Sequence, residues 1–271
     1  MGAPLPIGAP APAADPVHTA IARAADATGV DFQYLLAQAR IESRLDPSAR
    51  APTSSAAGLY QFTRGTWLRT IDRHGADHGL GWADAAIAGG RVGDPAMRRS
   101  ILALRYDPQA SAAMAAELAR DNGQALANVL GRAPDASELY LAHFLGSDGA
   151  TRFLAALASD PGQSAAAILP AAAATNRGIF YAGSGAPRSV GAVMDLIRGK
   201  MASAMSDPPT SLTGTRLAAA TRAVTATPAT AFDTAAASFA ASPASTAPVA
   251  AVPSRASMAE TLRATFGLDA A

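Results

Sequence analysis

Residues 39–49, ARIESRLDPSA, place one acidic side chain near the end of a predicted helix. Upstream, Asp31 can cap this helix. Its apolar residues recur on one stripe, namely Phe32, Leu35, Leu36 and Ala39. Glu42 follows Leu35 by two helical turns and therefore lies at the edge of the stripe. Since Pro47 disfavours a helical conformation in the residue before it, the helix must end soon after Glu42.

Glu42 has the surroundings that a general acid needs. A charged carboxylate is costly beside an apolar surface, so burial favours the neutral form, which carries a proton. A group that holds a proton near neutral pH beside a cleft can protonate a leaving group. We therefore take Glu42 as the candidate catalytic residue. The alternative is a helix-end ion pair between Glu42 and Arg40 or Arg44.

Helix signals continue over residues 15–202 and predict one mainly α domain. Asp–Pro pairs at 15–16, 94–95 and 107–108 are typical of helix starts. A capping box of Asp135 and Glu138 starts another helix, which we expect to end at Gly146. A last helix is expected over 190–201. No region alternates apolar and polar residues with a period of two, so we expect no sheet.

Composition excludes several classes of protein. The chain has 271 residues, of which 49% are hydrophobic, and a net charge of +1. Much of the apolar fraction is alanine, and no run reaches the roughly 20 large apolar residues of a membrane helix. The balanced charge argues against binding to nucleic acid or to a membrane surface. With no cysteine, the chain has no disulfide, thiol nucleophile or cysteine-bound metal.

The two ends of the chain differ from the domain. Residues 1–14 form a predicted flexible N-terminus without the basic and apolar regions of a secretory signal. The protein then stays inside, leaves by another route or was trimmed. Residues 203–253 are rich in Ala, Thr, Ser and Pro, which predicts a disordered tail. Residues 254–268 are predicted to form a short amphipathic helix, which would either dock a protein partner or fray.

The motif Glu-Ser-x-Leu-x-Pro-x-Ala at 42–49, followed by Ala-x-Gly-Leu-x-Gln at 56–61, resembles a known family. It is similar to the soluble lytic transglycosylases of lysozyme-like fold, relatives of goose-type lysozyme. The resemblance is strongest over residues 31–70 and extends weakly to about 202. It implies a lysozyme-like helical domain. It also implies cleavage of the β-1,4 bond between N-acetylmuramic acid and N-acetylglucosamine in peptidoglycan, with 1,6-anhydromuramoyl ends as product.

The resemblance also implies roles for individual residues. Glu42 would be the sole acid and base, with Ser43 beside it at the cleft. The backbone of Gly58 and Leu59, with Tyr60, would approach the glycan. Gln61 would bond the glycan or orient Glu42, unless it is a buried residue that satisfies the loop backbone.

A second wall of the cleft is implied around residues 142–146, Ala-His-Phe-Leu-Gly. His143 is a cleft-wall or packed residue, and Phe144 stands where the family has Asn. A tyrosine near the domain end often contacts the catalytic glutamate in this family, and Tyr181 is the candidate. Trp67 and Trp82 either stack on sugars or fill the core.

We expect no metal, because no glutamate lies between His74 and His78 and Gly75 weakens the helix that would align them. A lytic transglycosylase with Glu42 as its sole acid and base would also need no cofactor. A monomer in the periplasm or cell envelope, opening the wall for an envelope machine, is the expected setting. Two alternatives remain. One is a hydrolytic muramidase in which Asp46 or Asp72 holds the water. The other is a non-catalytic protein that binds peptidoglycan.

Overall fold

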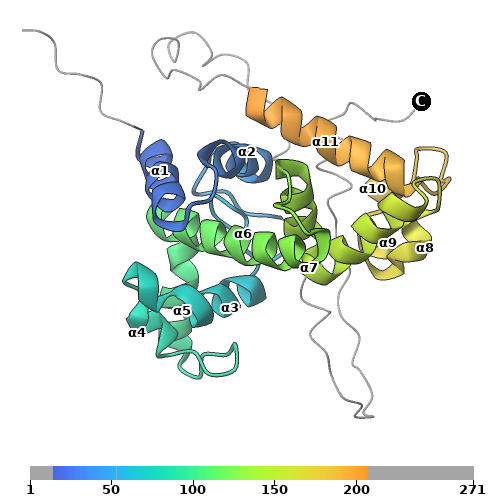
Figure 1. Ribbon diagram of the computed structural model, residues 1–271. Coiled ribbons are helices and arrows are strands. Elements are labelled where there is room, and N and C mark those ends of the chain that lie inside the picture. Colours follow the sequence, from blue (N-terminus) through green and yellow to red (C-terminus); the bar gives the residue numbers. More distant parts are fainter. Residues whose placement is uncertain (1–14, 53, 207–271) are drawn as a thin grey trace, which may run out of the picture.

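The computed structural model describes residues 15–52 and 54–206, and this part of the chain is mainly α-helical (Figure 1). Its backbone forms isolated bridges, but no strand is assigned in these ranges. The expected mainly α class is therefore confirmed. The elements are α1 (Pro16–Thr28), α2 (Phe32–Ser43), α3 (Arg64–His74), η1 (Ala76–His78), α4 (Gly81–Asp84), α5 (Pro95–Ala103), η2 (Leu104–Tyr106), α6 (Pro108–Leu130), α7 (Ala136–Ser159), α8 (Ala165–Ile168), α9 (Pro170–Thr175), α10 (Arg177–Phe180) and α11 (Val190–Ser206).

The predicted helix starts are confirmed at the level of single hydrogen bonds. Asp15, Asp94 and Asp107 each cap a helix by accepting from backbone amides, and proline occupies the first turn in each case. The capping box of Asp135 and Glu138 is also present. Local sequence signals therefore determine where these helices begin.

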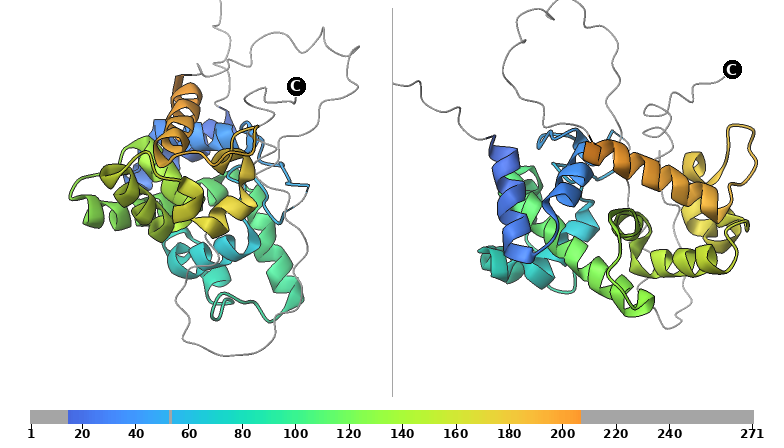
Figure 2. Two further views of the ribbon diagram at one scale, coloured as in Figure 1. Left: turned by 90° about the vertical axis from the view of Figure 1, so that its right-hand side faces the viewer. Right: turned by 45° about the horizontal axis from the view of Figure 1, so that its top comes forward.

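The long helix α6 runs through the middle of the structure (Figure 1). Helices α1 and α7 pack along it, and α3 also contacts it. Helix α11 lies across α2 and α7 (Figure 2), so the last described helix closes over an early one. None of the described helices has both the length and the apolar character needed to cross a bilayer.

Two helix ends differ from the sequence prediction. Helix α7 does not end at Gly146 but continues to Ser159, with a kink where Gly146 adopts φ 74° and ψ 162°. Glycine tolerates this conformation, so the chain resumes the helix after a single break. Helix α11 reaches Ser206 rather than 201. The predictions for residues 1–14 and 254–268, and for the tail from 207 onward, lie outside the described residues.

The loop between α2 and α3 holds the strained backbone of the described structure. Arg44, Leu45 and Gln61 are the non-glycine residues with positive φ in the described ranges, at 56°, 66° and 48°. Such conformations are uncommon for side-chain-bearing residues and persist only where surrounding contacts impose them. All three lie within residues 44–61, directly after Glu42. The chain is therefore forced into a tight path at the end of α2.

Arg105 stabilises this loop through hydrogen bonds and a close backbone contact. Its guanidinium is buried and donates hydrogen bonds to the carbonyl oxygens of Ser55 and Phe62, at 2.7 and 3.1 Å. The backbone of Arg105 also lies against Gly58, where a Cβ atom would come 1.7 Å from its carbonyl oxygen. Only glycine fits this position, because φ is 80° and because there is no space for a Cβ atom.

We expect Gly58→Ala to lower the free energy of unfolding by about 3 kcal/mol, the sum of left-handed strain and overpacking. Gly29→Ala is the matched control, because Gly29 has a similar φ of 74° and nothing within 4 Å of the added Cβ. It should cost only about 1 kcal/mol. Thermal unfolding should then fall by roughly 6–12 °C for Gly58→Ala and by about a third as much for the control. Equal shifts would contradict the packing explanation.

Candidate functional site

The carboxyl group of Glu42 is completely enclosed at the end of α2, with a side-chain exposure of 0%. Its Oε1 atom lies 3.4 Å from the hydroxyl of Tyr140 and 3.3 Å from Nε2 of His143. Its Oε2 atom is also buried and has no hydrogen-bond partner among the described residues. One oxygen of the carboxyl group therefore has polar neighbours, and the other has no hydrogen-bond partner in the described structure.

Helix α7 supplies both neighbours of Glu42. Tyr140 and His143 are three residues apart, so they share a face of the helix, and their rings stack with centroids 5.9 Å apart. Nδ1 of His143 lies 3.1 Å from Nε2 of Gln38, which precedes Glu42 by one turn of α2. Gln38 and Glu42 of α2 thus form one polar cluster with Tyr140 and His143 of α7.

Helix α11 adds Lys200, which is the single lysine of the chain and is 7% exposed. Burial lowers the pKa of Lys200 to about 7, although the charge of Glu42 opposes this change. The ammonium nitrogen lies 5.9 Å from the ring centroid of Tyr140. Burial, followed by the charge of Glu42, raises the pKa of Tyr34 and of Tyr140 above the ordinary range of tyrosine. The hydroxyls therefore stay protonated.

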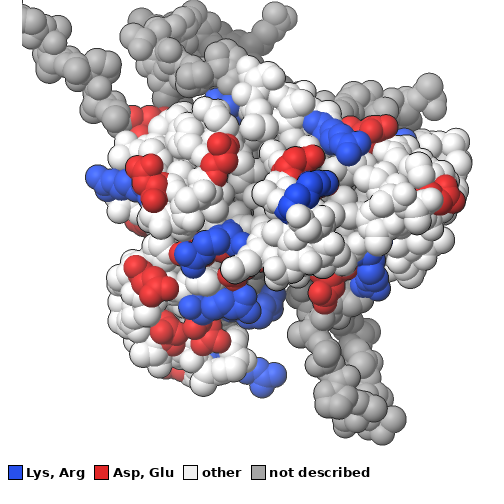
Figure 3. Space-filling view, in the orientation of Figure 1, with Lys and Arg blue, Asp and Glu red and all other residues white. Residues whose placement is uncertain are grey.

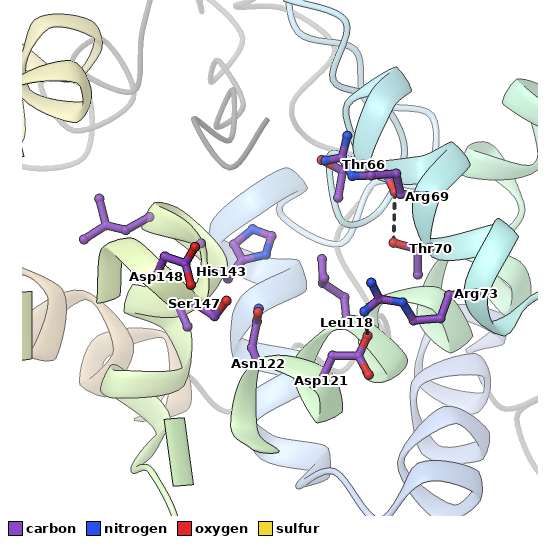
Figure 4. Close-up of a pocket in the computed structure, with 13 residues that line it drawn as sticks. Thr66, Arg69, Thr70, Arg73, Leu118, Asp121, Asn122, His143, Ser147 and Asp148 are labelled. Atoms are coloured by element: carbon purple, nitrogen blue, oxygen red, sulfur yellow. Dashed lines mark hydrogen bonds and ion pairs between the residues drawn. The ribbon is translucent and has the colours of Figure 1, made fainter. Parts of the chain in front are cut away.

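A groove of about 320 Å³ lies beside this cluster, bounded by α3, α6 and α7. This volume is at the low end of those typical of ligand sites. Figure 4 shows Arg69 and Arg73 of α3 facing Ser147 and Asp148 of α7 across it, with His143 and Asn122 between them. His143 lines the groove and also contacts Glu42. Its ring is therefore the link between the groove and the buried carboxyl.

The charged residues of the groove are already paired in part. Asp121 lies 2.7 Å from Arg73 and 2.9 Å from Nε2 of His74. Desolvation would raise the pKa of Asp121, but the hydrogen bonds from His74 and Arg73 outweigh it and lower the pKa. His78 lies 2.7 Å from Glu117, also on α6. These histidines tie α3 and η1 to α6, and the described residues contain no group of three or more potential ligands suited to a metal ion.

The other residues predicted around Glu42 hold the loop together. The hydroxyl of Ser43 donates to the carbonyl oxygen of Leu59 at 2.8 Å, and that of Tyr60 donates to Leu35. The amide of Gln61 donates to the carbonyl oxygens of Gly58 and Ala49. This is the backbone-satisfying arrangement considered for Gln61. The need for glycine at position 58 is explained by its close contact with the backbone of Arg105. Contact of residues 58–61 with a glycan stays a prediction.

Two aromatic predictions are resolved differently by the structure. The tyrosine hydroxyl against Glu42 comes from Tyr140 and not from Tyr181, whose ring lies 4.5 Å from the guanidinium of Arg177. Trp67 is fully buried and donates to the carbonyl oxygen of Ile101, so it belongs to the core. Trp82 is 47% exposed on α4.

Sequence reasoning missed Gln38, Tyr140 and Lys200 as neighbours of Glu42. Gln38 carried a local signal, because a residue four positions before Glu42 lies on the same helical face. Tyr140 shares a face with His143 but looked like a core residue. Nothing local connects Lys200 to Glu42, which lies 158 positions earlier in the sequence.

A comparison of the chain with models of known protein families found no match.

We expect the side chain of Lys200 to titrate with a midpoint near 7, compared with about 10.4 for a free lysine, because burial penalises its charge. NMR of protein with ¹³C-labelled lysine resolves this directly, since one lysine gives one set of Cε signals. A midpoint near 10 in the folded wild type would contradict the burial of this ammonium group.

Proposed function

We propose that the protein is a peptidoglycan lytic transglycosylase that cleaves the β-1,4 bond between N-acetylmuramic acid and N-acetylglucosamine. The observation that carries the proposal is the fully enclosed carboxyl group of Glu42, which contacts Tyr140 and His143 beside a groove. The resemblance of residues 42–49 and 56–61 to this family supports the same assignment. Peptidoglycan strands are then the partner, and the periplasm or cell envelope is the place of action.

One carboxyl group is sufficient for this reaction. Glu42 protonates the oxygen of the leaving sugar as the bond from that oxygen to C1 of the muramoyl residue breaks. The 6-hydroxyl of the same residue then forms the new bond to C1, and its proton returns to Glu42. No water is consumed, so the acid is restored and the product is the 1,6-anhydro end. Hydrolysis with a second carboxylate, in contrast, needs a group placed across the bond.

Access to Glu42 requires movement of a side chain. The carboxyl group has no exposed surface, whereas the His143 side chain is 11% exposed and lines the groove. Binding of a glycan therefore displaces the His143 ring or its neighbours before the proton is transferred. Hydrogen bonds at catalytic groups commonly rearrange when substrate binds.

A hydrolytic muramidase is less well supported. Asp46 is exposed and accepts hydrogen bonds from the amide and hydroxyl of Ser48, and Asp72 is exposed on α3. Neither lines the groove, where the acidic residues are Asp121 and Asp148. Asp46 and Asp72 are therefore badly placed to activate a water molecule.

A non-catalytic protein that binds peptidoglycan is favoured by one observation, the complete burial of Glu42. A buried acid that never meets substrate would serve only to link α2 and α7. Acidic and basic side chains are interspersed on the face seen in Figure 3, so this face offers no single-sign surface for a strongly charged partner. A measurement of peptidoglycan cleavage distinguishes the transglycosylase from the non-catalytic binding protein.

We expect Glu42→Gln to reduce the release of anhydromuropeptides from purified peptidoglycan by at least about 10³-fold, because it removes the only acid. Mass spectrometry of the products is the measurement. Glu138→Gln is the matched control, since Glu138 is a buried glutamate in the first turn of α7 that is hydrogen-bonded to Arg132 and does not contact Glu42, and glutamine preserves its capping role.

The control should keep wild-type activity, and both variants should unfold cooperatively. Reducing ends in place of anhydro ends would identify a muramidase. Binding of peptidoglycan without any cleavage by the wild type would overturn the enzymatic proposal in favour of the non-catalytic one.

A further inference from the structure

Gln38 is hydrogen-bonded to His143, and the opposite nitrogen of the His143 ring lies 3.3 Å from one oxygen of Glu42. We propose that they are positioning residues: Gln38 sets the tautomer of His143, and His143 makes Oε1 of Glu42 the acceptor, which leaves Oε2 to carry the transferable proton. The catalytic meaning of this arrangement rests on the proposed function. The order of hydrogen bonds does not, and it can be measured separately.

The first step is the contact between Gln38 and His143. Nε2 of the Gln38 amide is a donor only, and it lies 3.1 Å from Nδ1 of His143. Nδ1 must therefore accept and carries no proton. In the neutral ring the proton then sits on Nε2. Gln38 is 2% exposed, so water does not compete for this contact.

The second step is the contact between His143 and Glu42. The protonated Nε2 faces Oε1 of Glu42 at 3.3 Å, and the Tyr140 hydroxyl faces the same oxygen at 3.4 Å. Both donors converge on Oε1. The oxygen that these two donors face takes the role of the carbonyl oxygen in a neutral carboxylic acid. Its proton then belongs on the other oxygen.

The third step concerns that other oxygen, Oε2. It is buried and has no hydrogen-bond partner among the described residues, which is costly for a charged oxygen. A neutral hydroxyl at Oε2 can protonate the oxygen of a leaving group once the His143 ring or its neighbours have moved. The titratable groups that face Glu42 are Tyr34 on its own helix, Tyr140 and His143 on α7, and Lys200 on α11. Only His143 also lines the groove.

The tautomer of His143 is the first test. NMR of the full chain with ¹⁵N-labelled histidine distinguishes a protonated Nδ1 from a protonated Nε2. The chain has four histidines, so the His143 signals are those missing in His143→Gln. We expect a proton on Nε2 and none on Nδ1 in the wild type near neutral pH. Gln38→Glu should place a proton on Nδ1, because a carboxylate there can only accept.

A proton on Nδ1 in the wild type would overturn the proposal, as would a ring that does not respond to Gln38→Glu. Neither readout depends on cleavage of peptidoglycan. A merely structural role for Gln38 would change stability without moving this proton.

The catalytic consequence is the second test. Gln38→Leu keeps the size of the side chain but removes the donor, and it should lower the turnover of anhydromuropeptide release by roughly 10- to 100-fold through misplacement of the acid. Gln33→Leu is the control, since Gln33 is an exposed residue of the same helix. It should stay within about twofold of the wild type.

The outcomes separate the two proposals. Wild-type turnover in Gln38→Leu would overturn the positioning role while the proposed function stands. An inactive wild type with the expected tautomer would overturn the proposed function and support the hydrogen-bond order. The expected tautomer together with the selective loss in Gln38→Leu supports both.

Discussion

The burial of a carboxyl group where three helices meet is the constraint that the rest of the described structure accommodates. Glu42 of α2 contacts α7 through Tyr140 and His143, and it lies close enough to Lys200 of α11 to interact with it electrostatically. An enclosed carboxyl group is tolerated only where polar neighbours replace the water it has lost. The packing of α11 across α2 and α7 provides that enclosure, so one side chain connects the first third of the domain to its last helix.

The loop after Glu42 shows how this position is maintained. Residues with uncommon backbone conformations are concentrated at 44–61, and Arg105 holds the loop by donating to carbonyl oxygens on both of its sides. The side chains of Ser43 and Gln61 also donate hydrogen bonds to the loop backbone. Strain of this kind persists where the surroundings impose it and is common at functional sites. Rigid support close to the acid suits chemistry that depends on placement.

Sequence alone predicted the local features and missed those that depend on tertiary packing. Helix starts at Asp15, Asp94 and Asp107 follow from capping chemistry, which acts over three or four residues. The sequence predicts a helix end at Gly146, whereas the helix resumes after a single break there, and local sequence does not reveal this. The choice of Tyr140 over Tyr181 beside Glu42 depends on how α2 meets α7, and no short-range signal reports this. The proximity of Lys200 is a result of the same kind.

The enclosure of Lys200 has a consequence for the exterior of the molecule. Since the chain has one lysine and it is buried, the basic side chains on the described surface are guanidinium groups. These remain charged at every physiological pH, and Arg132 pairs with Glu138 through two parallel hydrogen bonds. The described surface is also inert toward acylating reagents that seek amines. Acetylation of this lysine would require α11 to lift away, which would make the modification a reporter of opening.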